Sequence, residues 1–140
     1  MTRHFKQCNA RNFKSGRSAK IKYIVVHYTA NYGDTAKNNA DYFAREKVGA
    51  SANYFIDEDS VWQSVMDTDT AWHCGGKMQG KRTKRGGAFH DVCTNSNSIG
   101  IEMCLLDRRG NVRQKVIDNT IEWVKLKMAE YDIPASHVIR

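Results

Sequence analysis

The stretch Lys20-Ile-Lys-Tyr-Ile-Val-Val-His27 decides the fold class of this chain. Its second half is an unbroken run of apolar, mostly β-branched residues, which is typical of a strand buried on both faces. A histidine closes the run at the point where the strand opens into a loop. We therefore predict a central strand over residues 20–27 that projects the His27 imidazole from a rigid edge, a suitable place for a metal ligand. A lone histidine is more often structural, so this position needs support from elsewhere.

A second apolar stretch, Ser98-Ile-Gly-Ile-Glu-Met-Cys-Leu105, carries one carboxylate in its middle. The period of two in a strand places Glu102 on the same face as Gly100 and Cys104, opposite Ile99, Ile101 and Met103. An unpaired charge is expensive to bury. Glu102 therefore faces water, pairs with a cation or lines a site, and the strand pattern leaves these alternatives open.

The remaining elements follow from periodicity and turn residues. Asp34 is the predicted N-cap of a helix whose apolar positions repeat at helical spacing and which ends at Gly49. Residues 51–56 and 61–66 are expected to be strands joined by the turn-forming residues 57–60. A turn over residues 107–110 then leads to a long helix with the apolar stripe Ile117, Ile121, Val124 and Met128, and residues 137–140 begin a last strand. This order predicts a mixed α/β fold, with a central mixed β-sheet flanked by helices.

Length and composition indicate a single globular domain. A chain of 140 residues can bury one core, and no apolar run approaches the roughly 20 residues of a membrane span. Residues 1–18 are polar and basic without an apolar segment, so we expect no signal peptide and synthesis in the cytoplasm. The formal net charge of +7 favours polyanions such as an anionic cell wall.

A long loop is expected between His73 and Asn97, which makes it either functional or mobile. It carries a cluster of basic side chains: Lys77, Lys81, Arg82, Lys84, Arg85 and the nearby His90. We interpret the cluster as a solvated loop and not as a nucleic-acid surface, because no aromatic platform or helix-turn-helix pattern accompanies it.

The chain has four cysteines and no C-x-x-C pair, so neither a disulfide scaffold nor a closed cysteine metal site is expected. Cys104 is predicted to be a small core residue. Cys74 and Cys93 flank the long loop, and the sequence leaves open whether they pair.

Four blocks of sequence together resemble one known family. They are Val25-Val-His27-Tyr-Thr29, Ala50-Ser-Ala-Asn-Tyr-Phe-Ile-Asp57, Ala71-Trp-His73-Cys-Gly75 and Asn97-Ser-Ile-Gly-Ile-Glu102. In this order and spacing they resemble the zinc amidases of the amidase-2 group, which includes phage lysins, bacterial autolysins and, more remotely, animal peptidoglycan recognition proteins. The resemblance covers the chain from about Lys20 to its end.

The resemblance implies an enzyme that cuts the amide bond between N-acetylmuramic acid and L-alanine in peptidoglycan, using water activated by Zn²⁺. It implies that His27 is the first of three zinc ligands and that Glu102 activates the water. Thr29, Asn53, Trp72 and His73 are the expected substrate-binding residues, although Trp72 and His73 also suit a core position and its surface partner.

The implied setting is a phage or prophage endolysin that acts on the bacterial cell wall, with no nucleic-acid partner and no membrane insertion. A catalytically inactive peptidoglycan-binding module of the same fold is the alternative. Glu102 favours the enzyme, because a binding module needs no general base.

Two departures from the family pattern stand out. Some relatives carry a tyrosine near the position of Ala52, and strand alternation puts Tyr54 on the same side as that position. In the family, a strand such as His137-Val-Ile-Arg140 leads into the second histidine ligand, followed by a lysine and the third ligand. We therefore expect the remaining ligands beyond Arg140, and interpret residues 1–140 as a single amidase catalytic domain truncated at its C-terminal end. On this hypothesis the chain binds zinc poorly.

Overall fold

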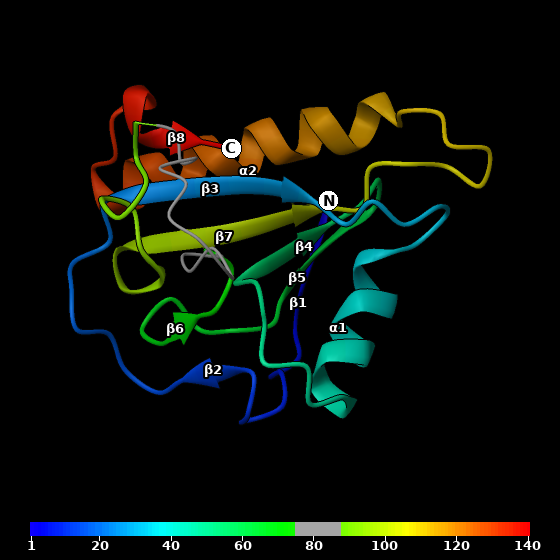
Figure 1. Cartoon of the computed structure of the whole chain (residues 1–140). Coiled ribbons are helices and arrows are strands. Elements are labelled where there is room, and N and C mark those ends of the chain that lie inside the picture. The colour runs from blue at the N-terminus through cyan, green and yellow to red at the C-terminus, as the bar shows by residue number, and fades with distance from the viewer. Residues whose placement is uncertain (75–87) are drawn as a thin grey trace, which may run out of the picture.

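The computed structural model describes residues 1–74 and 88–140, and the predicted basic cluster at residues 77–85 lies outside these ranges. Figure 1 shows a central sheet with the N-terminal strand at one edge and the C-terminal strand at the other. Neither helix of the described part is long and apolar enough to cross a lipid bilayer.

The sheet has six strands in the order β1-β5-β4-β7-β3-β8. β4 and β5 are antiparallel, and the other neighbouring pairs are parallel. This confirms the predicted mixed sheet. The strands are β1 (Thr2–Phe5), β3 (Tyr23–Tyr28), β4 (Tyr54–Ile56), β5 (Ser60–Gln63), β7 (Ser98–Met103) and β8 (Val138–Ile139). β2 (Phe13–Lys14) and β6 (Thr70–Ala71) form a separate antiparallel pair.

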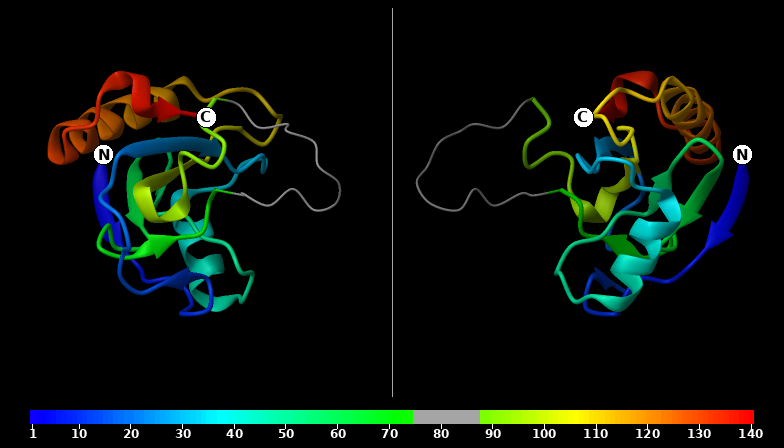
Figure 2. Two further views of the ribbon diagram at one scale, coloured as in Figure 1. Left: turned by 60° about the vertical axis from the view of Figure 1, so that its left-hand side comes forward. Right: turned by 90° about the vertical axis from the view of Figure 1, so that its right-hand side faces the viewer.

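The two α-helices lie on opposite sides of the sheet (Figure 2). α2 (Gln114–Tyr131) covers one face, where Ile24, Ile99 and Ile101 pack with Trp123 in the main core. α1 (Ala36–Arg45) lies on the other face, over a smaller cluster that contains Phe55 and Cys104. The two faces predicted for β7 are confirmed, and Cys104 is fully buried as expected. Short 3₁₀ turns, η1 (Asn95–Asn97) and η2 (Ala135–His137), precede β7 and β8.

Both helices begin or pack slightly differently from the sequence expectation. The N-cap of α1 is Thr35, whose hydroxyl accepts the Asn38 N–H at 3.1 Å, and not Asp34. Asp34 instead accepts a hydrogen bond from the Asn39 side chain at 2.7 Å. On α2 the predicted stripe is rotated, so that Ile121 is 48% exposed.

A buried ion pair explains the rotation of α2. Lys127 lies on the buried face of the helix, and its Nζ is 2.7 Å from Asp67 Oδ2. The hydroxyls of Tyr54 and Tyr131 donate to the same carboxylate, at 2.8 and 2.9 Å. The buried stripe therefore includes polar groups that satisfy one another, and helical periodicity of apolar residues alone does not locate it.

The placement of Tyr54 corrects another expectation. Its ring packs on Trp123, with centroids 5.2 Å apart, on the α2 side of the sheet. Ala52 belongs to the cluster under α1, on the opposite side. The regular strand β4 begins only at Tyr54, so strand alternation does not extend back to Ala52.

Candidate active site

An open cleft of about 650 Å³ lies on the α1 side of the sheet. Its floor includes Glu102, and its walls come from the segment after β3, from α1 and from the segment that follows β6. Thr29, Trp72 and His73, which the sequence placed in the substrate site, all line it. The further lining residues are Tyr28, Asn31, Asp34, Asn38, Asn39, Tyr42, Phe43, Ala50, Ser51, Ala52 and Phe55.

His27 and Glu102 are direct neighbours on adjacent parallel strands. β3 and β7 pair in a register that sets His27 opposite Glu102 and Val25 opposite Gly100. Register partners in a parallel pair present their side chains on the same face of the sheet. The structure therefore brings together the two residues that the sequence proposed for metal binding and proton transfer.

The His73 ring lies directly over Gly100. A Cβ atom built at position 100 would be 2.4 Å from His73 Cγ, so only glycine leaves room for this ring. The ring meets His27 edge to face, with centroids 5.9 Å apart. Ser98 Oγ lies 3.1 Å from His73 Nε2 and donates to Thr94 O at 2.5 Å, so Ser98 is the acceptor for His73.

Substitution of Gly100 by alanine should displace His73 from this seat. We expect a loss of about 1–3 kcal/mol in the free energy of unfolding, because the added methyl group overpacks a fixed ring. Chemical denaturation of Gly100→Ala measures the loss. In a His73→Ala background the same substitution should cost much less, and an equal cost in both backgrounds would contradict the proposed contact.

Burial sets the protonation of Glu102. Removal from water, and next the negative charge of Asp34, raise the pKa of Glu102 to about 7. Within the described part of the chain, Glu102 Oε2 is buried without a hydrogen-bond partner. A carboxyl group with a pKa near neutrality can both take up and release a proton, as general acid–base catalysis requires.

His27 is held in its neutral form. Burial, and next the neighbouring His73, lower the pKa of the His27 imidazole. Its Nε2 atom is buried and has no hydrogen-bond partner among the described residues. A neutral imidazole with an unused nitrogen fits one ligand of a transition metal.

A complete metal site needs more than His27. In residues 1–74 and 88–140, no group of three His, Cys, Asp or Glu side chains is placed to hold an ion. Residues 75–87 contain none of these four residue types. A catalytic zinc takes about three protein ligands, so these residues supply one candidate ligand and do not by themselves fit the metal.

Asn53 does not reach the cleft. Its side chain is fully buried, where Oδ1 accepts the Gly100 N–H at 3.0 Å and Nδ2 donates to Val65 O at 3.3 Å. The structure therefore corrects the expectation that Asn53 binds substrate. Asn53 instead joins β7 to the segment after β5, which fixes the floor of the site from below.

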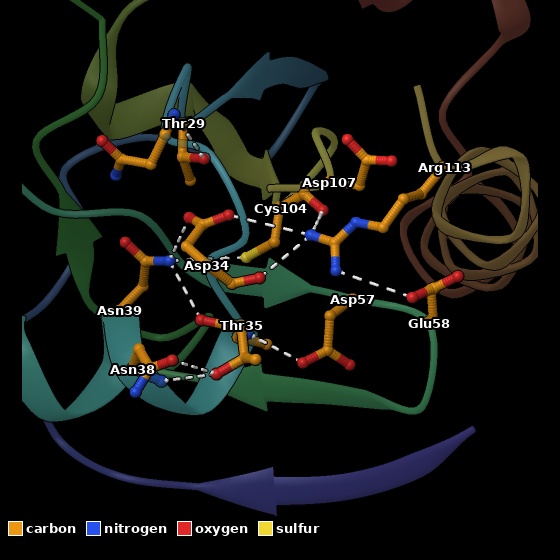
Figure 3. Close-up of polar contacts among 12 residues, drawn as sticks. Thr29, Asp34, Thr35, Asn38, Asn39, Asp57, Glu58, Cys104, Asp107 and Arg113 are labelled. Atoms are coloured by element: carbon orange, nitrogen blue, oxygen red, sulfur yellow. Dashed lines mark hydrogen bonds and ion pairs between the residues drawn. The ribbon is translucent and has the colours of Figure 1, made fainter. Parts of the chain in front are cut away.

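An arginine holds the α1 wall of the cleft against the end of β7 (Figure 3). The Arg113 guanidinium donates to the backbone carbonyls of Asp34, at 2.9 Å, and Cys104. It also lies 3.8 Å from the Asp34 carboxylate and 3.6 Å from that of Glu58. The segment that carries Asp34 is therefore fixed on both its main chain and its side chain.

Several residues that position the site were not singled out in the sequence. Asn95 Oδ1 accepts the N–H groups of His73 and Cys74, at 3.0 and 2.7 Å, and Ser98 holds the His73 ring. The one available signal was Gly100, a glycine inside an apolar strand, which often marks close approach by another group.

Comparison with known proteins identifies the family of this chain. The sequence profile of the Amidase_2 family, described as N-acetylmuramoyl-L-alanine amidase, matches residues 17–140. The chain belongs to this family. Among solved structures, a mutant endolysin from Bacillus subtilis is 28% identical with a TM-score of 0.76, over 99% of this chain and 83% of that one. The mixed α/β fold predicted for an Amidase_2 member is thereby confirmed.

Curated relatives of this Amidase_2 chain are named N-acetylmuramoyl-L-alanine amidases, in agreement with the description of the family. N-acetylmuramoyl-L-alanine amidase CwlL of Bacillus licheniformis is 28% identical over 87% of this chain. N-acetylmuramoyl-L-alanine amidase BlyA of Bacillus subtilis (strain 168) is 33% identical over 71% of this chain. The chain spans 34% of the length of the first and 28% of the length of the second.

Proposed function

We propose that this chain is an N-acetylmuramoyl-L-alanine amidase domain that hydrolyses the amide bond between N-acetylmuramic acid and the L-alanine of the peptidoglycan stem peptide. One observation carries the proposal. In a member of the Amidase_2 family, a half-buried carboxyl group, Glu102, lines an open cleft and pairs in register with His27 on the adjacent strand. Its pKa is raised to about 7.

Glu102 is the proposed proton carrier of the reaction. Its carboxylate takes a proton from the water molecule whose oxygen attacks the amide carbon. As the carbon–nitrogen bond breaks, the same carboxyl group returns the proton to the departing L-alanine amine. A pKa near 7 suits both the uptake of the proton from water and its return to the amine, because neither transfer is then strongly unfavourable at neutral pH.

His27 is the proposed contact to the zinc ion that amidases of this family generally use. When bound, zinc would polarise the amide carbonyl and ease ionisation of water. Burial lowers the pKa of the imidazole and so favours its neutral form, and Nε2 has no hydrogen-bond partner among the described residues.

Thr29, Trp72 and His73 are the proposed substrate contacts. All three line the cleft, and they come from two segments of the chain, the one after β3 and the one after β6. The indole of Trp72 offers an apolar face on which a saccharide ring can pack, and its backbone N–H is fixed to Ser51 Oγ at 3.0 Å. A fixed aromatic surface loses little conformational entropy on binding.

An endolysin is the biological setting that we propose, with the bacterial cell wall as the place of action. The structural similarity to an endolysin supports this setting. The raised pKa of Glu102 favours an enzyme over a module that only binds peptidoglycan, since binding needs no proton carrier in a costly buried position.

The bond that is cut provides the test. Purified peptidoglycan is incubated with the chain in excess Zn²⁺, and new free amino groups and new reducing ends are quantified separately. We expect N-terminal L-alanine to appear without new reducing ends. Release of reducing ends, or of amino groups other than that of L-alanine, would assign a different hydrolase.

Zinc should bind this chain weakly. The described residues offer one unpartnered imidazole and no group of three ligands, whereas tight sites use three or four. Equilibrium dialysis with metal analysis should therefore show substoichiometric zinc at micromolar concentrations. His27→Ala should lower the residual binding further, and a stoichiometric, dialysis-resistant zinc ion would refute the prediction.

A further inference from the structure

Two half-exposed cysteines meet beside the cleft. Cys74 directly follows His73, and Cys93 precedes η1, so 18 residues of sequence separate them. Both are free thiols. Their side chains interact with each other, and both also interact with the hydroxyl of Ser98.

Asn95 and Ser98 connect the segment that carries Cys74 to the segment that carries Cys93. Asn95 lies two residues after Cys93 in the sequence, and its Oδ1 accepts the Cys74 N–H at 2.7 Å. Ser98 Oγ lies 3.6 Å from Cys74 Sγ and donates to Thr94 O, the carbonyl next to Cys93, at 2.5 Å. These hydrogen bonds hold Cys74 against the turn that carries Cys93, so the fold itself keeps the two cysteines side by side.

Cys74 is partly exposed and has a lowered pKa. It lines an open hollow of about 490 Å³ together with Trp72 and Asn95. The interaction with Cys93, and further contacts to His73 and Ser98, lower the pKa of Cys74 to about 4 against the opposing effect of burial. The partner interaction raises the pKa of Cys93. One thiolate beside one thiol is the arrangement in which disulfide exchange starts at a defined sulfur.

The other two cysteines, Cys8 and Cys104, are buried and have raised pKa values. Cys8 is 3% exposed, and burial raises its pKa to about 11. Cys104 is 0% exposed, and burial raises its pKa as well. Inert, buried thiols of this kind serve as internal controls.

We propose that Cys74 and Cys93 are an oxidisable pair that closes to a disulfide in the presence of a low-molecular-weight disulfide. The Cys74 thiolate attacks one sulfur of the small disulfide and expels one small thiolate, which leaves a mixed disulfide on Cys74. Cys93 gives its proton to solvent and attacks Cys74 Sγ, which expels the second small thiol. Two protein thiols lose two electrons, and the small disulfide becomes two thiols.

Closure of the pair changes the surroundings of His73. Cys74 Sγ lies 3.6 Å from His73 Nδ1 in the reduced chain, and the new bond draws it towards Cys93. Of the two ring-nitrogen contacts described for His73, the one from Nε2 to Ser98 then remains. The imidazole that rests on Gly100 beside His27 thus depends on the redox state of the pair. This proposal stands whether or not the chain is an amidase.

Glutathione disulfide provides the test on the folded chain. After treatment without denaturant, we expect two of the four thiols to be lost, a mass decrease of about 2 Da for the two hydrogen atoms removed, and a peptide map that joins Cys74 to Cys93. Cross-linking closes a loop in the unfolded chain, so the midpoint of thermal unfolding should rise by about 5 °C and fall back on reduction. Four intact thiols, or a link to Cys8 or Cys104, would overturn the proposal.

Two serine variants separate the roles of the sulfurs. Cys93→Ser should stop at a mixed disulfide on Cys74, with the mass of one glutathione added. Cys74→Ser should react at least tenfold more slowly at neutral pH, because Cys93 lacks the low pKa of its partner. Equal rates in the two variants would show that Cys74 is not the attacking sulfur.

Discussion

Replacement of Glu102 by glutamine should lower amidase activity by roughly 10²- to 10⁴-fold, the usual contribution of a general acid–base group. Glutamine keeps the size of the side chain, but its amide neither accepts nor releases a proton near neutral pH. Burial of Glu102 already costs free energy, because the carboxyl group has no hydrogen-bond partner for Oε2 among the described residues. The fold should therefore tolerate the neutral amide, with little change in the free energy of unfolding.

The measurement is release of N-terminal L-alanine from peptidoglycan, in parallel with thermal unfolding. Glu122→Gln, on the exposed side of α2, is the matched control and should retain full activity. Activity of the wild-type chain should rise with pH through about 7, because only the deprotonated carboxylate accepts a proton from water. Glu102→Gln with full activity, or with the same rise, would remove Glu102 from the mechanism.

Replacement of Asp67 by alanine should destabilise the fold by about 3 kcal/mol, the lower end of the cost of breaking a buried ion pair. The Asp67 carboxylate accepts hydrogen bonds from Lys127, Tyr54 and Tyr131 beneath α2. Its loss leaves a buried ammonium group, the buried Tyr54 hydroxyl and the partly buried Tyr131 hydroxyl without this acceptor. The effect stays near the lower end because Lys127 keeps its contact to Glu130, at 2.8 Å.

Thermal and urea unfolding measure this change, and the midpoint temperature should fall by about 10 °C. Asp41→Ala is the matched control, because Asp41 also binds two lysines, at 2.5 and 2.6 Å, but at the surface. Exposed ion pairs contribute little, so this variant should unfold almost like the wild type. Lys127→Met combined with Asp67→Leu should recover much of the loss, since apolar groups can replace both charges. Similar losses for Asp67→Ala and Asp41→Ala would refute the buried-pair explanation.

The sequence predicted elements whose apolar pattern is strong and local. The strand that ends near His27, the strand that carries Glu102 and both helices were expected close to where they occur. The edge strand β1 was not predicted, because all four of its residues are exposed and its pairing with β5 leaves no apolar period. The exposed position of Ile121 was missed for a related reason, since α2 buries Lys127 in its place.

By itself the sequence singled out His27 and Glu102, a polar side chain at the end of one apolar strand and inside another, and the four blocks that resemble the amidase-2 group gave them their expected roles. Only the tertiary structure decided how they meet. The register of β3 on β7 places His27 beside Glu102, and the missing side chain of Gly100 admits His73. Asn53 is turned into the interior by its bond to Gly100, and Cys74 is brought to Cys93. Such contacts join residues far apart in the chain, and packing between elements fixes them, which local periodicity cannot encode.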